Sequence, residues 1–155
     1  MPRFQFQLST LLKLREAARD QRRTELAEAY HVDELLQSRQ RQLQDDMNSL
    51  RDNCRLAARP GTVRVDPLIE SQRYELMLKA QEHQLGQQRE AVAAEIERRR
   101  EALVEANREV RILEKLRERQ SERHAHAEAR REARLLDEVA QRRALPEEVE
   151  AWPES

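Results

Sequence analysis

Histidine and cysteine are the residue types in this sequence that most often bind metals or perform catalysis. His124 and His126 stand two residues apart in an H-A-H stretch, and on a helix such a step separates two side chains by about 200°. Zinc ligands provided by one helix need i, i+4 spacing instead. Cys54 falls at an apolar position of a heptad pattern, so we interpret it as a small core residue. We therefore expect no metal site, no cofactor and no catalytic residue.

Glycine-rich and arginine-rich motifs do not indicate a site either. A phosphate-binding loop needs clustered glycines, whereas Gly61 and Gly86 are 25 residues apart. Arginine runs at 98–100 and 130–131 suggest nucleic acid, but residues 96–144 hold 14 basic and 11 acidic side chains. Acidic residues lie within helical reach of most of these arginines, which is typical of a solvated face with ion pairs. We expect a protein that is not an enzyme and does not bind nucleic acid.

The composition of the 155-residue chain predicts long helices rather than a globular core. Charged residues make up 38% of it and aromatic residues 3%, a bias typical of coiled coils. Because aromatic and β-branched side chains are few, the apolar residues can fill only a narrow seam. We therefore expect one elongated domain.

Charge, cysteine content and hydropathy restrict where the protein works. A net charge of −1 argues against a binder of nucleic acid or membrane surfaces, which would carry a surplus of one sign. The single cysteine allows no intrachain disulfide and fits a reducing compartment. No apolar run approaches the ~18 residues of a bilayer span, and the start, M-P-R-F-Q-F-Q, has no secretory apolar region. We expect a cytoplasmic protein without direct membrane insertion that docks on a membrane-bound partner.

Proline and glycine divide the chain into two helical stretches. Pro60 disfavours helical geometry at the residue before it, Gly61 is free to turn, and Asp66 followed by Pro67 is typical of a helix start. Pro146 ends the second stretch, and the acidic, proline-interrupted tail beyond it, which includes Trp152, is expected to be disordered. We predict a single coiled-coil domain over 1–145, with a first helix over about 5–58, a turn over about 59–66, a second helix over about 67–144, and a disordered acidic tail over 146–155.

Apolar residues follow a heptad pattern in both stretches, as a coiled-coil seam requires. The pattern includes Ala29, Leu36, Leu43, Met47 and Leu50 in the first helix and Leu78, Leu85, Val92, Ile96, Leu103, Ala106, Val110 and Leu113 in the second. A short connection makes the helices antiparallel neighbours. The predicted fold class is all-α, a long antiparallel two-helix coiled coil or helical hairpin, with an overhanging C-terminal helix. Expected facing pairs are Met47 with Leu78, Ala29 with Ile96, and Leu12 with Leu113. Arg99 is a polar intrusion into the seam.

Four leucines near the start of the chain exceed what one facing helix covers. They are Leu8, Leu11, Leu12 and Leu14. A seam would use Leu8 and Leu12 and leave Leu11 and Leu14 pointing away from it. Just behind them, Arg15, Arg19 and Arg22 occupy seam positions and predict that the seam at this open end of the hairpin is either hydrated or engaged elsewhere. We therefore expect another protein to cover the outward-facing leucines.

A second stripe at helical spacing lies near the turn. It consists of Tyr74, Leu78, Gln81 and Leu85. A core stripe facing residues 40–51 is the simpler interpretation, and a docking face is the alternative. Gly86 follows the stripe at a helix-interior position, where glycine costs about 1 kcal/mol relative to alanine. We interpret it as a tolerated weak point, with a bend or a close partner approach as the alternative.

Three segments rich in leucine and charged residues, taken in order, carry a family resemblance. They read F-Q-F-Q-L-S-T-L-L-K-L-R-E at 4–16, E-V-R-I-L-E-K-L-R-E-R-Q at 109–120 and E-A-R-L-L-D-E-V-A-Q-R-R at 132–143. Together with the overall length and the single central break, they resemble the FliJ family of flagellar type III export proteins. The resemblance spans nearly the whole chain.

The resemblance implies a mechanism. Proteins of this family form an antiparallel two-helix coiled coil similar to the rotor stalk of rotary ATPases. Their open end inserts into the hexameric flagellar export ATPase, another part engages the cytoplasmic domain of the export gate protein, and the family also handles export chaperones. The implied location is cytoplasmic, peripherally associated with the inner membrane through the export apparatus.

Carried over by position, the resemblance implies two sets of binding residues. Those that would meet the ATPase ring are Leu8, Leu11, Leu12, Leu14, Arg15, Lys115, Leu116 and Arg119. Those in the export-gate region are Tyr74, Leu78, Gln81 and Leu85. Two alternatives stay open: the equivalent stalk of a virulence type III injectisome, and a structural coiled-coil adaptor that self-associates through the overhang.

Overall fold

The computed structural model describes residues 2–58, 61 and 64–145, which form two long α-helices. Helix α1 spans Ser9–Ala57 and helix α2 spans Val65–Ala144. The helices pack against each other, so the predicted all-α helical hairpin is confirmed. No described helix combines the length and the hydropathy that a bilayer crossing needs. The predicted turn over 59–66 lies partly outside the described residues, and the predicted tail over 146–155, with Trp152, lies wholly outside them.

Helix α1 begins at Ser9 rather than near residue 5, because the preceding residues 2–8, here called the N-terminal segment, follow a non-helical path. The Phe6 carbonyl accepts the Ser9 N–H at 3.2 Å. Phe6 is buried and Phe4 packs against the same cluster. On a helix, residues two apart point about 200° apart, so a helical path would keep one of these rings from the cluster. In an extended path, residues two apart share a side.

Helix α2 begins at Val65, two residues before its predicted start. Asp66 therefore lies in the first turn rather than at the capping position, where its carboxylate still faces the positive end of the helix dipole. Pro67 also lies in this first turn. Backbone N–H groups there have no acceptor within the helix, so the N–H that proline lacks is not needed.

The chain divides into two compact units. The hairpin unit holds residues 15–108, and the terminal unit holds residues 1–14 and 109–155. The division falls inside both helices, after Leu14 in α1 and after Arg108 in α2. The single domain over 1–145 stays a prediction.

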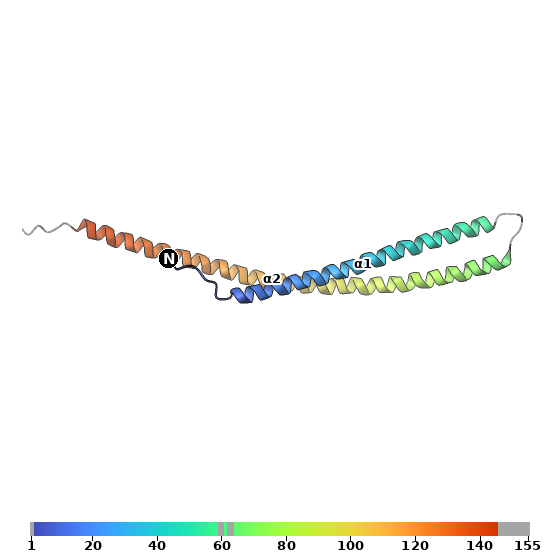
Figure 1. Ribbon diagram of the computed structural model, residues 1–155, viewed down its shortest axis with the longest axis horizontal. Helices are drawn as coiled ribbons and strands as arrows, with labels where there is room; N and C mark the ends of the chain where they lie inside the picture. The colour runs from blue at the N-terminus through green and yellow to red at the C-terminus, as the bar shows by residue number, and fades with distance from the viewer. Residues whose placement is uncertain (1, 59–60, 62–63, 146–155) are drawn as a thin grey trace, which may run out of the picture. The chain divides into compact units, whose positions relative to one another are not determined.

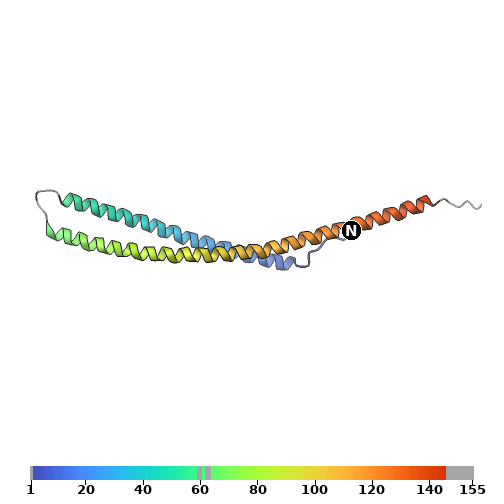
Figure 2. The same ribbon diagram turned by 180° about the vertical axis from the view of Figure 1, so that it is seen from behind.

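In the hairpin unit, α1 and α2 run antiparallel and side by side, as Figures 1 and 2 show from opposite sides. Their facing side chains form the helical cluster, which consists of Leu43, Met47, Leu78 and Leu85, with Leu36 and Leu50 packed against it. Because Met47 and Leu78 share this cluster, their predicted pairing is confirmed. Ala29 and Ile96 are also buried, as their heptad positions require.

Polar contacts between the two helices hold the same register. Arg89 donates a hydrogen bond to the side-chain oxygen of Gln40 at 2.7 Å. Arg99, the predicted polar intrusion, donates to the backbone carbonyl of Glu25. Because a slip of one heptad would separate these partners by about 10 Å along the helix axis, the contacts oppose alternative pairings.

In the terminal unit, the apolar side chains come from both helices and from the N-terminal segment. They form the terminal cluster, which consists of Phe6, Leu12, Val110 and Leu113, with Phe4 and Leu116 packed against it. Leu12 and Leu113 share this cluster, which confirms their predicted pairing. Figure 1 shows the N-terminal segment alongside α2. Every side chain of residues 129–145 is exposed, so this part of α2 is uncovered within the unit.

Candidate functional site

Three of the four leucines near the start of α1 are exposed. Leu12 is 4% exposed and belongs to the terminal cluster, whereas Leu11 and Leu14 lie outside the cluster. Leu8 is 37% exposed, so its predicted seam position is wrong. The reason is that α1 begins after Leu8, and Phe6 from the N-terminal segment packs in the cluster with Leu12 instead.

The other residues predicted to meet an ATPase ring differ in accessibility. Leu116 is partly buried against the terminal cluster. Lys115 and Arg119 are exposed, and neither forms an ion pair within the described part of the chain. Arg15 is exposed as well, but it interacts with another residue. Within the terminal unit, the exposed leucines and these two unpaired cations are therefore open to a partner.

The seam of α1 behind the leucines is wet, as predicted. No apolar side chain is buried between residues 13 and 28 of α1. Arg19 and Arg22, which occupy seam positions, form local ion pairs at 3.3 Å with Asp20 and at 3.1 Å with Glu25. Ion pairs of this exposed kind contribute little stability, so this stretch of α1 is weakly held compared with the helical cluster.

Two arginines further along α2 link the helices electrostatically. The Nε of Arg99 donates to the Glu95 carboxylate at 2.9 Å, and this hydrogen bond, with the charge of Arg98, holds the pKa of Glu95 below its ordinary value. Arg100 donates to the hydroxyl of Tyr30 at 2.7 Å, which raises the pKa of Arg100. The hydrogen bond between Arg99 and Glu95 lies within α2, whereas those from Arg99 to the Glu25 carbonyl and from Arg100 to Tyr30 cross to α1 and help to specify the register.

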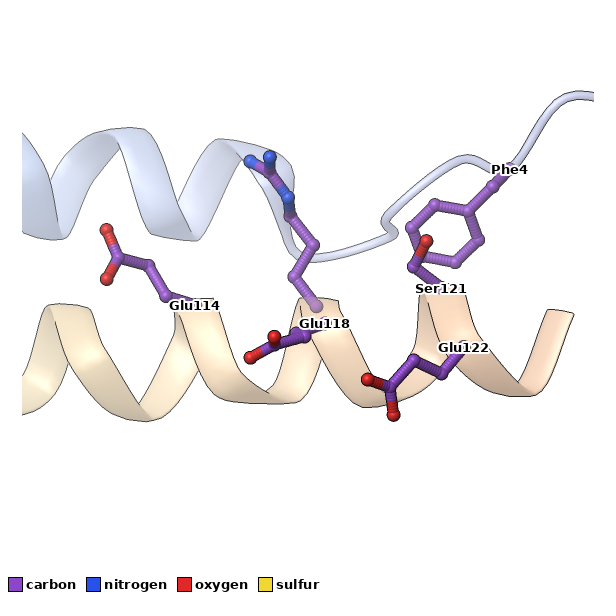
Figure 3. A pocket seen from close by; sticks show the side chains of 6 residues that line it. Phe4, Glu114, Glu118, Ser121 and Glu122 are labelled. Carbon is purple, nitrogen blue, oxygen red and sulfur yellow. The ribbon is translucent and has the colours of Figure 1, made fainter. Parts of the chain in front are cut away.

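The N-terminal segment brings to the site two aromatic residues that the heptad pattern does not assign. Phe6 is buried in the terminal cluster. The ring centroid of Phe4 lies 5.8 Å from that of His124, with the rings tilted by 55°. Figure 3 shows the Phe4 ring beside Ser121 of α2. The alternation F-Q-F-Q could have indicated that both rings face the cluster, because alternate residues of an extended chain face the same side.

A pocket of about 550 Å³ adjoins Phe4 on the surface of α2. It is lined by Phe4, Glu114, Arg117, Glu118, Ser121 and Glu122. The three glutamates follow one another at i, i+4 and i+8 on successive turns (Figure 3), and none forms an ion pair within the described residues. The lining therefore combines one aromatic ring with three carboxylates on the surface of α2.

The predicted export-gate residues fall into two groups. Leu78 and Leu85 are buried in the helical cluster, with Leu78 only 2% exposed. They face α1 because they occupy d positions of the heptad, so in this hairpin they are covered, and the export-gate contact stays a prediction. Tyr74 and Gln81 are exposed, together with the neighbouring Met77. The core interpretation of the stripe holds for its leucines, and only the other residues are accessible.

The remaining candidates for chemistry lie apart from one another. No group of three or more His, Cys, Asp or Glu side chains within the described ranges could hold a metal ion. Cys54 is half-buried, as its heptad position predicts. Helix α2 runs through Gly86 without a break, and a Cβ built there meets nothing within 4 Å. The continuous helix favours the weak-point interpretation of Gly86 over a break in the helix, and the close approach of a partner stays an open alternative.

Comparison with known families gives one match. The model of the flagellar FliJ protein family matches residues 4–148, which is nearly the entire chain. No curated protein and no solved structure matches the chain.

Proposed function

The chain belongs to the FliJ family and is a component of the flagellar export apparatus, and on that premise we propose that it is a non-enzymatic stalk of this apparatus. In this proposal the terminal unit inserts into the hexameric export ATPase. The hairpin unit engages the cytoplasmic domain of the export gate protein, and the protein also handles export chaperones. It works in the cytoplasm, held at the inner membrane through its partners.

The exposed leucines of the terminal unit carry this proposal. Leu11 and Leu14 lie outside the terminal cluster on the surface of α1, and Leu8 beside them is exposed as well. Apolar side chains grouped in this way gain free energy when a partner removes them from water, at about 25 cal/mol per Å². Lys115 and Arg119 on α2 add two cations that can pair with a partner's carboxylates.

The polar seam around Arg19 and Arg22 in the hairpin unit favours a stalk within a ring over a self-associating adaptor. Arg19 and Arg22 keep this stretch of α1 polar through their ion pairs with acidic neighbours. Obligate interfaces are more hydrophobic than such a stretch, so it makes a poor surface for self-association. Such an arrangement suits a stalk that contacts successive subunits without binding any of them permanently.

For the export gate, the accessible part of the predicted set defines the proposed surface. Tyr74, Met77 and Gln81 are exposed at i, i+3 and i+7 of α2, so they share one face. Leu78 and Leu85 support this face from behind by anchoring α2 to α1. A tyrosine and a methionine are residue types that often anchor protein interfaces.

A pair of charge substitutions tests the ATPase contact. Leu11→Glu with Leu14→Glu is expected to abolish binding to the flagellar export ATPase and stimulation of its hydrolysis, while helicity by circular dichroism stays unchanged. The matched control is Val32→Glu with Leu35→Glu. It places two glutamates at the same i, i+3 spacing on α1, at residues exposed by 44% and 58%, compared with 37% and 63% for Leu11 and Leu14.

The control decides how the result is interpreted. Loss of stimulation by the leucine 11 and 14 pair but not by the control pair supports the placement of the ATPase contact. Unchanged stimulation by both pairs contradicts it. Repeating the assay with an injectisome ATPase tests the alternative system, because a flagellar stalk is expected to stimulate the flagellar enzyme more strongly.

Self-association through the end of α2 is the second candidate. Leu135, Leu136 and Val139 are all exposed there, and residues 129–145 have no covering element within the terminal unit. Exposed apolar groups of this kind mark interaction sites. Sedimentation velocity separates the candidates: a single sedimentation coefficient for a monomer at all concentrations contradicts the adaptor, and a concentration-dependent dimer supports it.

A further inference from the structure

The N-terminal segment occupies an apolar groove that is built by other parts of the terminal unit. The groove consists of Leu12 of α1 and Val110, Leu113 and Leu116 of α2. Phe6 fills it and Phe4 packs beside it. The occupant is thus a short non-helical stretch that inserts two large apolar side chains spaced two residues apart.

The N-terminal segment is held in the groove by few interactions. Within the described residues its backbone hydrogen bonds run from the Ser9 N–H to the Phe6 carbonyl and from the Leu12 N–H to the Leu8 carbonyl, and both are local contacts at the helix start. No hydrogen bond or ion pair within the described residues joins the segment to α2. The burial of the Phe6 ring and part of the Phe4 ring therefore has to offset most of the backbone entropy that the segment loses, so the segment is weakly held.

Water reaches the edge of the contact. The pocket of about 550 Å³ adjoins Phe4, and its wall carries three unpaired glutamates of α2. Phe4 itself is only partly buried, and the residues between and around the two rings, Arg3, Gln5 and Gln7, are exposed. Segments with few buried contacts and no backbone pairing open at low free energy compared with the rest of a fold.

We propose that the N-terminal segment is a displaceable occupant of this groove, and that a partner segment with two large apolar side chains at alternate positions replaces it. This inference rests on the proposed function, and the partner is the export ATPase. When the segment leaves, Leu12, Val110, Leu113 and Leu116 become accessible next to the exposed Leu11 and Leu14. The partner then covers these groove residues in addition to the exposed leucines.

The energetic consequence is competition within the chain. A site that is free only part of the time binds with an apparent dissociation constant raised in inverse proportion to its free fraction. Weakening the segment therefore tightens binding. The double substitution Phe4→Ala with Phe6→Ala is expected to strengthen ATPase binding about five- to tenfold, an estimate for a segment that occupies the groove most of the time.

The control for this variant changes the same segment without its rings. Arg3→Ala with Gln5→Ala and Gln7→Ala alters only exposed side chains and is expected to leave the affinity within about twofold. Equal affinity for wild type and for the phenylalanine variant overturns the proposal. Weaker binding by the phenylalanine variant also overturns it, because the rings would then belong to the surface that the ATPase contacts.

A cross-link tests the closed state. Phe4→Cys with His124→Cys, in a Cys54→Ser background, places two thiols where the rings now meet. Joining them with a short bis-maleimide is expected to weaken ATPase binding about tenfold or more, relative to the same variant capped with a monofunctional maleimide. Unchanged binding after cross-linking overturns the proposal.

A measurement without the ATPase separates this inference from the proposed function. The thiol of Leu113→Cys, in the Cys54→Ser background, reports access to the groove, and the thiol of Leu78→Cys reports the helical cluster. Phe4→Ala with Phe6→Ala is expected to accelerate labelling at position 113 several-fold and leave the labelling rate at position 78 unchanged.

If wild type binds no ATPase but labelling at position 113 accelerates in this way, the proposed function fails while the displaceable segment stands. If position 113 does not respond, the displaceable segment fails even though the ATPase binds.

Discussion

The helical cluster and the terminal cluster bury similar apolar side chains with different backbones. The helical cluster takes all of its members from two facing helices, at heptad positions. The terminal cluster needs Phe6, which comes from a non-helical segment. A helix carries its side chains into a seam with every backbone hydrogen bond made, whereas the N-terminal segment gains only the burial of its rings. The first cluster should therefore fix the fold, and the second should respond to conditions and partners.

The largest expected effect is the loss of a central side chain from the helical cluster. Leu78→Ala leaves a cavity between α1 and α2 and is expected to lower the free energy of unfolding by about 2–5 kcal/mol, measured by urea denaturation followed by circular dichroism. Leu76→Ala, on the same helix but exposed, is the control and should change it by less than about 0.5 kcal/mol. Equal losses for the two variants would contradict the assignment of the core.

A smaller effect is expected in the terminal cluster. Phe6→Ala removes a buried ring, but the N-terminal segment can detach without leaving a closed cavity, so the free energy of unfolding should fall by only about 1 kcal/mol. Hydrogen exchange is expected to accelerate at the first turns of α1 and to stay unchanged near Leu43. A loss as large as that of Leu78→Ala would show that the two clusters stabilise the fold alike.

This contrast also explains how much could be predicted from the sequence. Heptad spacing identified the seam and the pairing of Met47 with Leu78, because in a two-helix seam burial follows directly from helical period. The same reasoning placed Leu8 in the seam, where it does not lie. Period alone cannot show that a helix begins late and that a ring from outside it, here Phe6, takes the place of a heptad residue.

The candidate site was predictable to a lesser degree. The exposure of Leu11 and Leu14 followed from their position relative to Leu12, since neighbouring residues on a helix are about 100° apart. The export-gate set mixed buried with exposed residues, because a resemblance carries positions but not the direction in which each side chain points. Leu78 and Leu85 are apolar because they pack in the core between α1 and α2.

Gly86 offers a way to strengthen the helical region without touching either cluster. Because a Cβ at this position meets nothing within 4 Å, Gly86→Ala is expected to raise the free energy of unfolding by up to about 1 kcal/mol through helix propensity. Ala91→Gly, at an exposed position of the same helix, is the reciprocal control and should lower it by a similar amount. A destabilising Gly86→Ala would contradict the interpretation of Gly86 as a weak point of the helix.

The smallest expected effect is electrostatic and lies in the hairpin unit. Arg99 holds the pKa of Glu95 below the ordinary value of 4.5. A carboxyl whose pKa is lower in the folded state than in the unfolded state stabilises the fold above its unfolded pKa, and this contribution is lost as the pH falls through the folded pKa. Glu95→Gln should therefore be slightly less stable than wild type near pH 7, and the difference should shrink as the pH falls below about 4.5. Thermal unfolding at matched ionic strength measures this difference in stability.

Glu101→Gln, which removes a charge that forms no ion pair within the described residues, serves as the control. Because the Glu95 side chain is only partly buried, salt should also reduce the difference, and a difference that persists at high salt and low pH would assign the effect to packing instead of charge.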